Sequence, residues 1–431
     1  MYALVDGNNF YVSCERVFMP SLRNRPVVVL SNNDGCAIAR SNEARAMGIK
    51  MGAPWFQIRH LEEKGLVALS ANFALYGDLS DRMMSLVAGL GHRQEIYSID
   101  ESFVDLSGIR GDLTLRARKM RQRIADWIKI PTCIGIGPTK TLAKLANHIA
   151  KTAERKPGSY PEHLAQVCHL GVMSQTELEQ VLAATEVGEV WGVGPRIGKQ
   201  LREAGIQTVL DLTRLSPATV RSRWSVVLER TVRELQGTPC IELEDCPSAK
   251  QEIACTRSFG RAVTELSDLQ EVVTEFASRA AEKLRRQNSH VGQVLSFIRT
   301  SPFRPDSQYS RSVIVPLRRP TSDTHLIVRA ALLALDAIYR PGFKYAKAGV
   351  MLLDLQGVEV CQGELALDEA DDRDRSRLMN IIDQTNRSQG RGTLMLASAG
   401  LEGGKRRWAM RQERRSLQYT TKWGEMVVVR A

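Results

Sequence analysis

"EIYSIDESFVDLSG", residues 95–108, places two acidic residues, Asp100 and Glu101, side by side within an apolar, β-prone run. Neighbouring side chains of one strand point to opposite faces, so a single strand can present only one of these carboxylates at a common site. Two short paired strands, Glu95–Ile99 and Ser102–Leu106, with the acids at their connection would bring both to one point. Such oxygen clusters bind hard cations such as Mg²⁺, although an Asp-Glu pair also marks ordinary exposed turns.

A third carboxylate follows the apolar run at the N-terminus, "MYALVDGNNFYVSCE". Tyr2–Val5 is typical of a buried strand, and Asp6 comes directly after it. Three carboxylates on adjacent strand ends are the usual protein contribution to two-metal phosphoryl transfer, in which one ion activates the attacking hydroxyl and the other holds the leaving phosphates. The sequence therefore suggests a phosphoryl-transfer site, provided that Asp6, Asp100 and Glu101 meet.

The composition favours a polyanionic partner. The chain has 431 residues, 43% of them hydrophobic, which is enough for three or four domains with their own cores. With 59 Lys and Arg against 48 Asp and Glu, the formal net charge is +11, and the basic residues are clustered. Basic proteins without such a partner also exist, so this charge is supporting evidence only.

Cysteine usage and hydropathy indicate a cytoplasmic protein. The eight cysteines are scattered without a Cys-x-x-Cys pair, and the seven histidines add no zinc-ligand spacing, so we expect reduced thiols. No apolar run is long enough to span a membrane, and Asp6 interrupts any signal-peptide pattern.

The chain divides into regions of different pattern. Residues 1–158 alternate strand-like and helix-like segments, among them a strand at 25–31 and a helix at 39–48, which is typical of an α+β unit. A Gly/Pro/Ser break at 155–162 opens the next region. The later regions are a helix-rich segment to about Gly237, a linker at 237–252, a strand-rich segment with a long helix (Leu266–Gln287) to about Leu355, and a polar tail.

The segment "IGIGPTKTLAKLANHIAKTAERKPG", residues 134–158, predicts a two-faced helix. One face is apolar and the other cationic: Leu142, Leu145 and Ile149 on the first, and Lys140, Lys144 and Lys151, with His148 between them, on the second. A lysine stripe is usually a solvated face. Because this one follows a Gly-rich turn and shares a region with the three acids, binding of a triphosphate or pyrophosphate is a serious alternative. Asn42 and Arg45, one helical turn apart, offer further donors.

The segment 187–212 contains Gly192-Val193-Gly194 between two predicted helical stretches, with Arg196 and Lys199 close behind. Glycines let backbone amides approach a phosphate, and adjacent cations add favourable counterion release. The pattern is a helix-hairpin-helix, which binds the duplex backbone without reading sequence. A lone Gly-x-Gly is a weak signal, and the in-phase second helix strengthens it.

Four motifs stand in a characteristic order: ALVDGNNFYVSCE (3–15), VVVLSNNDGCAIARSNEARAMGIKMG (27–52), YSIDESF (97–103) and GIGPTKTLAKLANHIAK (135–151). In order and spacing they resemble the Y-family translesion DNA polymerases. Further segments resemble the UmuC branch, the catalytic subunits of bacterial DNA polymerase V: LSNNDGC (30–36), ELQGTPC (234–240), KQEIACTRSFG (250–260), GRGTL (390–394) and YTT (419–421). The resemblance covers nearly the whole chain.

The resemblance implies an α+β multidomain right-hand polymerase with a ferredoxin-like palm, small fingers, a helix-hairpin-helix thumb and an α/β little finger. The implied domains are palm (1–10 and 72–158), fingers (11–71), thumb (159–236), linker (237–244), little finger (245–355) and a C-terminal tail for partner or DNA docking (356–431).

The resemblance also assigns roles to single residues. Asp6, Asp100 and Glu101 would hold two Mg²⁺ ions, with the backbone carbonyl of Gly7 as a further ligand. Tyr11 would be the steric gate beside the incoming sugar, although a core aromatic after a strand fits the sequence equally well.

Asn42, Arg45 and Lys151 match positions that contact the triphosphate, and other branches carry Tyr where this chain has Asn42. Gly192, Gly194, Arg196 and Lys199 would bind DNA.

The implied function is that of an error-prone translesion DNA-directed DNA polymerase of the SOS response, which adds dNTPs opposite damaged bases of a primer-template DNA without proofreading. A nucleotidyl cyclase would share the metal acids but not need the hairpin, and a non-catalytic DNA-binding scaffold would not need the acids. The implied partners are a cleaved UmuD-type dimer and a RecA filament.

Two features of the tail bear on docking. In the basic stretch "GGKRRWAMRQERRS", residues 403–416, Trp408 is either a docking anchor or packs the tail onto the little finger. The segment "CQGELALDEADD" resembles a sliding-clamp peptide, with Gln362, Leu365 and Leu367 suitable but Asp368 where Phe is expected. We therefore expect weak clamp binding, or an acidic linker only.

Overall fold

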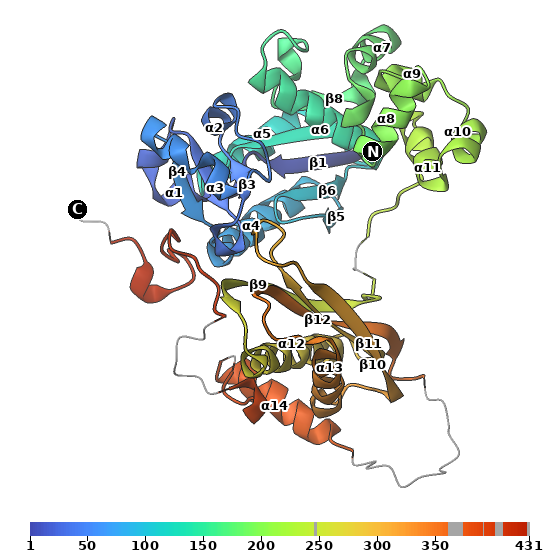
Figure 1. The fold of residues 1–431 in the computed structure, drawn as a ribbon. Helices are drawn as coiled ribbons and strands as arrows, with labels where there is room; N and C mark the ends of the chain where they lie inside the picture. Colours follow the sequence, from blue (N-terminus) through green and yellow to red (C-terminus); the bar gives the residue numbers. More distant parts are fainter. Residues whose placement is uncertain (245–247, 361–373, 391, 401–407, 429–431) are drawn as a thin grey trace. The chain divides into compact units, whose positions relative to one another are not determined.

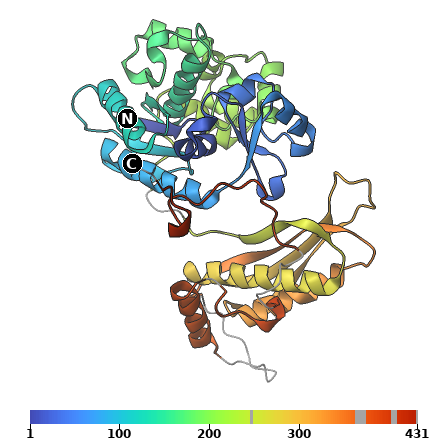
Figure 2. The same cartoon turned by 90° about the vertical axis from the view of Figure 1, so that its left-hand side faces the viewer.

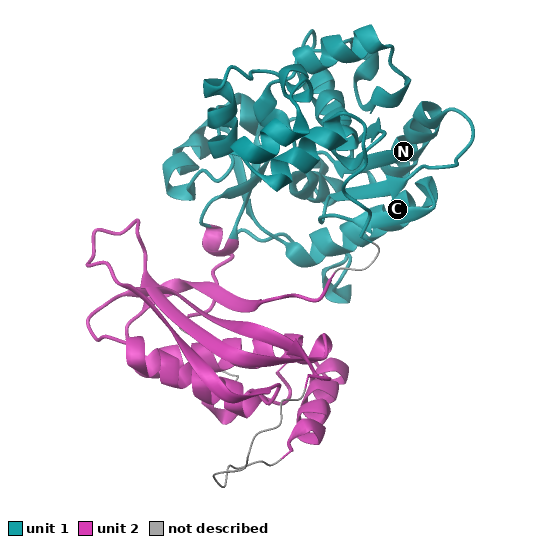
Figure 3. Cartoon of the chain, turned by 90° about the vertical axis from the view of Figure 1, so that its right-hand side faces the viewer, with its two compact units in different colours: residues 1–31, 35–247, 414–431 teal, residues 32–34, 248–413 magenta. Residues whose placement is uncertain are grey.

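A computed structural model describes residues 1–244, 248–360, 374–390, 392–400 and 408–428. The chain forms two compact units (Figures 1 and 3). Unit 1 comprises residues 1–31, 35–247 and 414–431, and unit 2 comprises residues 32–34 and 248–413. The region expected to be a single tail, 356–431, is therefore divided between the two units.

A five-stranded sheet forms the centre of unit 1, with strand order β5-β6-β1-β7-β8. The central strand β1 pairs antiparallel with β6 and β7, and its residues Ala3, Leu4 and Val5 are fully buried. Ala3 and Val5 pack into the core that includes α4 and α5, whereas Leu4 packs beside Ala143 of α6, so β1 is covered on both faces. The elements are β1 (Tyr2–Gly7), β5 (Arg93–Ile96), β6 (Glu101–Asp105), β7 (Thr132–Gly137), β8 (Val167–His169), α4 (Phe73–Val87), α5 (Leu113–Ile128) and α6 (Lys140–Arg155).

The glycines before α6 do not form a turn, contrary to the sequence-based expectation. Gly135 and Gly137 lie inside β7, where the helix backbone comes very close to the strand. A Cβ atom on Gly135 would lie 2.1 Å from the amide nitrogen of Asn147 in α6. These glycines therefore allow α6 to pack directly on the sheet, and they do not cradle a phosphate.

A three-stranded sheet of order β3-β2-β4 follows α1. The strand predicted at 25–31 is confirmed as β2, but the helix predicted at 39–48 begins later, because Ala39 and Arg40 belong to β3. Ser41 caps α2 by accepting a hydrogen bond from the amide of Ala44. The elements are α1 (Phe10–Phe18), β2 (Val27–Leu30), β3 (Ala37–Arg40), α2 (Asn42–Ala46), α3 (Trp55–Ile58) and β4 (Val67–Ser70).

The predicted helix-rich region is present, and its helices share a core with one side of α6. The chain after it returns to the five-stranded sheet, where Leu243 packs with Leu4 and Phe103. The helices are α7 (Gln175–Ala183), α8 (Pro195–Glu203), α9 (Val209–Thr213), α10 (Pro217–Arg223) and α11 (Val226–Leu235).

Unit 2 is a four-stranded antiparallel sheet of order β11-β10-β12-β9 with two long helices on one face (Figure 2). The long helix predicted at Leu266–Gln287 is confirmed within one residue. The elements are β9 (Ile253–Val263), α12 (Leu266–Arg286), β10 (Ser289–Thr300), β11 (Ser310–Thr321), α13 (Thr324–Ile338), β12 (Tyr345–Gly357) and α14 (Ser376–Ser388).

Trp408 belongs to the core of unit 2. Its side chain is 2% exposed, and its ring meets that of Phe276 in α12 edge to face at 6.1 Å. The packing alternative for Trp408 is therefore correct and the docking-anchor alternative is wrong, because a buried ring cannot bind a partner. The clamp-peptide positions Gln362, Leu365, Leu367 and Asp368 lie outside the described residues.

Two further expectations from the sequence, on membrane-spanning segments and on the state of the cysteines, can be compared with the structure within the described ranges. None of the helices there is long and apolar enough to cross a membrane. Six cysteines in these ranges are free thiols: Cys14, Cys36, Cys133, Cys168, Cys240 and Cys255.

Candidate active site

The three predicted carboxylates come from adjacent strand ends. Asp6, near the end of β1, lies directly opposite Glu101, the first residue of β6. Asp100 lies in the connection before β6, and its backbone carbonyl accepts a hydrogen bond from the amide of Gly7 at 2.8 Å. The strand–connection–strand arrangement predicted from the sequence is present, with Glu101 inside the second strand.

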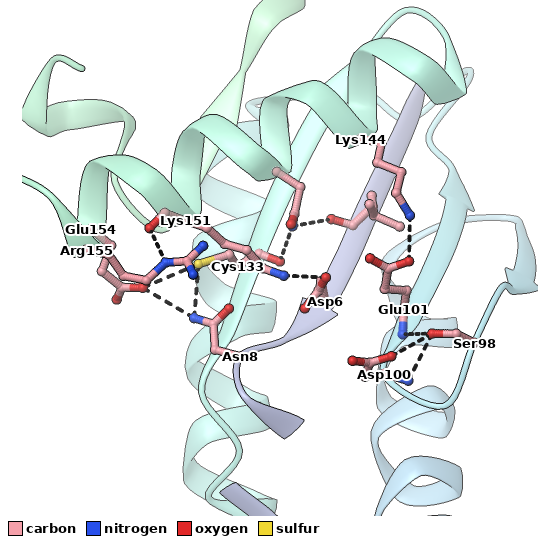
Figure 4. Close-up of polar contacts among 12 residues, drawn as sticks. Asp6, Asn8, Ser98, Asp100, Glu101, Cys133, Lys144, Lys151, Glu154 and Arg155 are labelled. Atoms are coloured by element: carbon pink, nitrogen blue, oxygen red, sulfur yellow. Dashed lines mark hydrogen bonds and ion pairs between the residues drawn. The ribbon is translucent and has the colours of Figure 1, made fainter. Parts of the chain in front are cut away.

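Each carboxylate has a different polar partner (Figure 4). Lys151 of α6 forms an ion pair with Asp6, and the Nζ of Lys144 lies 2.7 Å from Oε2 of Glu101. Asp100 instead accepts a hydrogen bond from the Ser98 hydroxyl at 2.7 Å. The cationic face predicted for α6 thus reaches the acids directly.

Burial raises the pKa of the Asp6 carboxyl to about 8, and the hydrogen bond with Glu101 adds to this effect while Lys151 opposes it. Burial also acts to raise the pKa of Glu101, but the hydrogen bond with Asp6 and the ammonium of Lys144 outweigh it, so that pKa is lowered. The two carboxyl groups therefore interact strongly, and Lys151 and Lys144 supply positive charge to the pair.

The donor set suits a hard divalent cation, because the three side chains supply only carboxylate oxygens. A bound divalent cation would offset the negative charge of Asp6 and Glu101. No three His, Cys, Asp or Glu side chains in the described ranges are already arranged around one point. Asp100, held by Ser98, would have to turn toward the other two acids to complete such a site.

A cavity of about 360 Å³ lies beside these acids. Its lining includes every predicted metal-binding or nucleotide-binding residue except Glu101: Asp6, Gly7, Tyr11, Asn42, Arg45, Asp100 and Lys151. Residues separated by more than 100 positions in the sequence thus meet around one space large enough for a small ligand.

The cavity also contains two cations that the sequence reasoning missed, Arg40 and Arg155. Burial lowers the pKa of Arg45, and the nearby Arg155 and Arg40 lower it further. Guanidinium groups that lie close together repel one another, and a bound anionic ligand would relieve this repulsion. Arg155 lies one helical turn after Lys151 on the same face of α6, so helical spacing in the sequence could have predicted its place in the site. No local sequence pattern indicates that Arg40 lies there.

Tyr11 lines the cavity and also packs against α4. Its ring stacks on Tyr76 of α4 at 4.6 Å and meets Phe73 edge to face at 6.0 Å. Asn42 accepts a hydrogen bond from the Asn9 side chain at 3.2 Å. Tyr11 and Asn42 thus line the same cavity as Asp6 and Asp100.

Lys140 does not belong to the cationic face of this site. Its side chain is buried, and its Nζ lies 2.6 Å from Oε2 of Glu95 and 4.8 Å from the centre of the Phe103 ring. The prediction that Lys140 shares a solvated or phosphate-binding stripe is wrong, because helical spacing alone does not reveal a buried acidic partner. Lys140 links α6 to β5 and β6.

The predicted hairpin begins with a short 3-10 turn, η7 (Val187–Glu189), and continues into α8. Gly192 has φ +86°, a backbone conformation that favours glycine, and Gly194 caps α8. Both glycines, Arg196 and Lys199 are exposed. The backbone of this turn and its two cations are accessible to a ligand.

Family comparisons agree with this geometry. The model of the impB/mucB/samB family matches residues 5–148, and the model of the C-terminal domain of the same family matches residues 250–365. The chain belongs to the impB/mucB/samB family of Y-family DNA polymerases. Residues 376–429 match a domain of unknown function.

Curated relatives align with most or all of the chain. Protein UmuC of Salmonella typhimurium is 44% identical over 437 aligned positions, which cover 100% of both chains. Protein MucB of Escherichia coli is 42% identical over 427 positions and 98% of both chains. DNA polymerase IV of Corynebacterium diphtheriae is 27% identical over 74% of this chain and 68% of its own length.

Solved structures show that the family fold is shared. A Y-family polymerase chimera of Dbh and Dpo4 has a TM-score of 0.63 at 18% identity, covering 83% of this chain and 99% of its own. The insertion ternary complex of Dbh DNA polymerase has a TM-score of 0.52 with the same coverage and identity. The right-hand polymerase fold predicted from the sequence is thereby confirmed.

Proposed function

We propose that this chain is an error-prone translesion DNA-directed DNA polymerase of the SOS response, which adds dNTPs opposite damaged template bases without proofreading. One observation carries the proposal: a single cavity combines Asp6 and Asp100 with the cations Arg45 and Lys151. A nucleotidyl-transfer site needs both groups, because acids hold metal and cations hold phosphates. The relatedness to UmuC and to DNA polymerase IV supports this assignment.

In the proposed site, Asp6, Asp100, Glu101 and the carbonyl of Gly7 would hold two Mg²⁺ ions. When bound, these ions would supply activation of the primer hydroxyl and charge neutralisation at the phosphates. Lys144 and Lys151 form ion pairs with Glu101 and Asp6 and so balance part of the negative charge of the site. Positioning and electrostatics account for most of the proposed rate acceleration.

The cationic and polar side chains that line the cavity with the acids would bind the nucleotide. Arg45, Lys151 and Asn42 are the proposed contacts to the triphosphate, with pyrophosphate leaving toward Lys151. Tyr11 is the proposed steric gate, since its ring lines the cavity and would occupy the place of a ribose 2′-hydroxyl. Arg40 and Arg155 join this group on the basis of their position in the same cavity.

The proposed DNA contacts lie in the hairpin: Gly192, Gly194, Arg196 and Lys199. Its exposed backbone and cations suit a duplex backbone, which is bound without sequence preference. Palm (1–10 and 72–158), fingers (11–71), thumb (159–236), little finger (245–355) and tail (356–431), with a linker at 237–244, remain the proposed domains.

The proposed partners are primer-template DNA, a cleaved UmuD-type dimer, a RecA filament and, weakly, a sliding clamp. The full-length relatedness to UmuC supports the first three. These partners and substrates place the proposed reaction in the cytoplasm.

Primer extension on a damaged template with Mg²⁺ tests the proposal. We expect nucleotide addition opposite the lesion. Cyclic-nucleotide formation from a nucleoside triphosphate without primer extension would support a cyclase instead, and DNA retention with neither reaction would support a non-catalytic scaffold. Each of these two outcomes contradicts the proposal.

A further inference from the structure

The segment 414–419 belongs to unit 1 and lies beside the strand β4. The amide of Arg414 donates to the Ser70 hydroxyl at 3.0 Å, and the amide of Ser70 donates to the Arg414 carbonyl at 3.1 Å. The Arg414 guanidinium lies 5.0 Å from the centre of the Trp55 ring and forms an ion pair with Glu62. The segment therefore contacts β4, α3 and the turn that follows α3.

Beyond Arg414 the same segment reaches the interior of unit 1. The Ser416 hydroxyl donates to Oε1 of Glu15 at 3.0 Å. Asn72, which caps α4, donates from its side-chain amide to Ser416 Oγ at 2.9 Å and to the Leu417 carbonyl at 3.0 Å. Tyr419 stacks on Phe18 of α1 at 4.7 Å. These contacts join the segment to α1 and α4, the two helices that carry Tyr11 and Tyr76.

Glu15 is the centre of this arrangement. It lies four residues after Tyr11 on the same face of α1 and is fully buried. The Tyr76 hydroxyl donates to the same Glu15 oxygen at 2.6 Å, and the Tyr76 ring stacks on Tyr11 with an interplanar angle of 16°. A continuous path of direct contacts thus runs from Ser416 through Glu15 and Tyr76 to Tyr11.

Glu15 depends strongly on its donors. Burial raises the pKa of its carboxyl, and the hydrogen bonds from Tyr76 and Ser416 oppose this rise. A buried carboxylate that loses one donor must take up a proton, admit water or draw its remaining donor into a new position. Because Tyr76 donates to the same oxygen of Glu15, we expect these responses to change its hydrogen bond, and the Tyr76 ring stacks on Tyr11.

We propose that residues 414–419, which lie within a domain of unknown function (376–429), act as a positioning segment for Tyr11. Ser416 is the positioning residue. Through Glu15 and Tyr76 it holds the Tyr11 ring at the depth that excludes a ribose 2′-hydroxyl from the cavity. This inference rests on the proposed polymerase function, and it adds that sugar selection is controlled from the opposite end of the chain.

The test compares Ser416→Ala and Ser416→Thr with the unmodified full-length protein. The measurement is kcat/KM for a dNTP and its matching rNTP, combined as a discrimination ratio. We expect Ser416→Ala to lower this ratio about threefold to tenfold, the range for loss of one ordinary hydrogen bond. Ser416→Thr keeps the hydroxyl and is expected to keep the ratio.

Two controls separate positioning from general destabilisation. Ser388→Ala removes an exposed serine hydroxyl from α14 in the same domain of unknown function, and it is expected to leave the ratio unchanged. In a Tyr11→Ala background, Ser416→Ala is expected to add no further loss of discrimination, because the positioned ring is absent. If Ser416 only stabilised the fold, Ser416→Ala would lower the discrimination ratio equally with and without the Tyr11 ring.

The possible outcomes are distinguishable. If the unmodified protein extends no primer, the proposed function itself fails, and this inference fails with it. If the protein is active and Tyr11→Ala admits ribonucleotides while Ser416→Ala discriminates normally, only the positioning role is overturned. An equal loss for Ser416→Ala and Ser416→Thr would also overturn it, because the hydroxyl would then be irrelevant.

Discussion

Asp6 and Glu101 lie directly opposite each other in the antiparallel pair of β1 and β6. Their register is fixed by buried neighbours, since a slip by one residue would move Leu4 and Phe103 to the wrong face of the sheet. The backbone pairing, and not the side-chain contacts, therefore brings the two carboxylates together. Neutral isosteres at these positions are expected to leave the fold intact.

We expect Asp100→Asn and Glu101→Gln each to lower nucleotide incorporation about 1,000-fold or more, because bound metal contributes several kcal/mol to such a transition state. Binding of primer-template DNA is expected to remain near its original strength, since the proposed DNA contacts lie in the hairpin at residues 192–199. Single-turnover incorporation and a DNA-binding titration provide the two measurements.

Asp126→Asn is the matched control for the acidic variants, because Asp126 is an exposed carboxylate on α5. It is expected to keep full activity. Near-normal primer extension by either Asp100→Asn or Glu101→Gln would show that the metal site has been assigned to the wrong residues.

We expect Tyr11→Ala to raise kcat/KM for ribonucleotides about tenfold or more while dNTP insertion is largely preserved. The substitution removes the ring from the cavity and leaves the carboxylates unchanged. Trp127→Ala, which removes a 70% exposed aromatic from α5, is the control. An unaltered preference between the two sugars would mean that Tyr11 serves only the packing with Tyr76 and Phe73.

We expect the double substitution Arg196→Ala and Lys199→Ala to weaken DNA binding equally across sequences. Each lost phosphate contact is expected to flatten the dependence of log Kd on log salt by about one unit. The matched control is Lys119→Ala with Arg123→Ala, which removes two exposed cations from α5. A loss that varied with the DNA sequence would indicate that the hairpin reads bases.

We expect Gly135→Ala to destabilise unit 1 by about 3 kcal/mol, because overpacking forces the backbone to move. The added Cβ would lie 2.1 Å from the Asn147 amide nitrogen. Gly77→Ala is the matched control, since nothing lies within 4 Å of the corresponding Cβ in α4. Alanine there is expected to stabilise the helix by about 0.5–1 kcal/mol.

Denaturant unfolding of the two glycine variants, followed by far-UV circular dichroism, measures both effects. Equal stability of Gly135→Ala and the unmodified protein would show that α6 can move away from β7 at little cost. In that case close packing of α6 would not explain why Gly135 and Gly137 occur in β7.

Local patterns were sufficient to predict much of the site. Asp6 follows a short apolar run, and Asp100 and Glu101 interrupt another, so the strand ends were visible without any knowledge of the fold. Helical spacing placed Lys144 and Lys151 on one face of α6, and both reach the acids. These features depend on periodicity, which a sequence displays directly.

Features that depend on contacts between distant segments were not predictable. The burial of Lys140 requires Glu95, which is 45 positions away, and the role of Gly135 requires the close approach of α6. The contact between Ser416 and Glu15 joins residues 401 positions apart. No local pattern in the sequence marks such pairs.

We expect Trp408→Ala to destabilise unit 2 by about 3–5 kcal/mol, the usual cost of removing a buried large aromatic side chain. The ring is 2% exposed and packs on Phe276, so its removal leaves a cavity beside α12. Trp423→Ala is the matched control, because Trp423 is 88% exposed and its loss is expected to change stability by less than about 0.5 kcal/mol. Hydrogen exchange of the α12 amides measures the stability of unit 2, and it is expected to become faster in Trp408→Ala but not in Trp423→Ala, which changes a residue of unit 1. If Trp408→Ala left this exchange unchanged but weakened DNA or partner binding, the ring would be a docking residue after all.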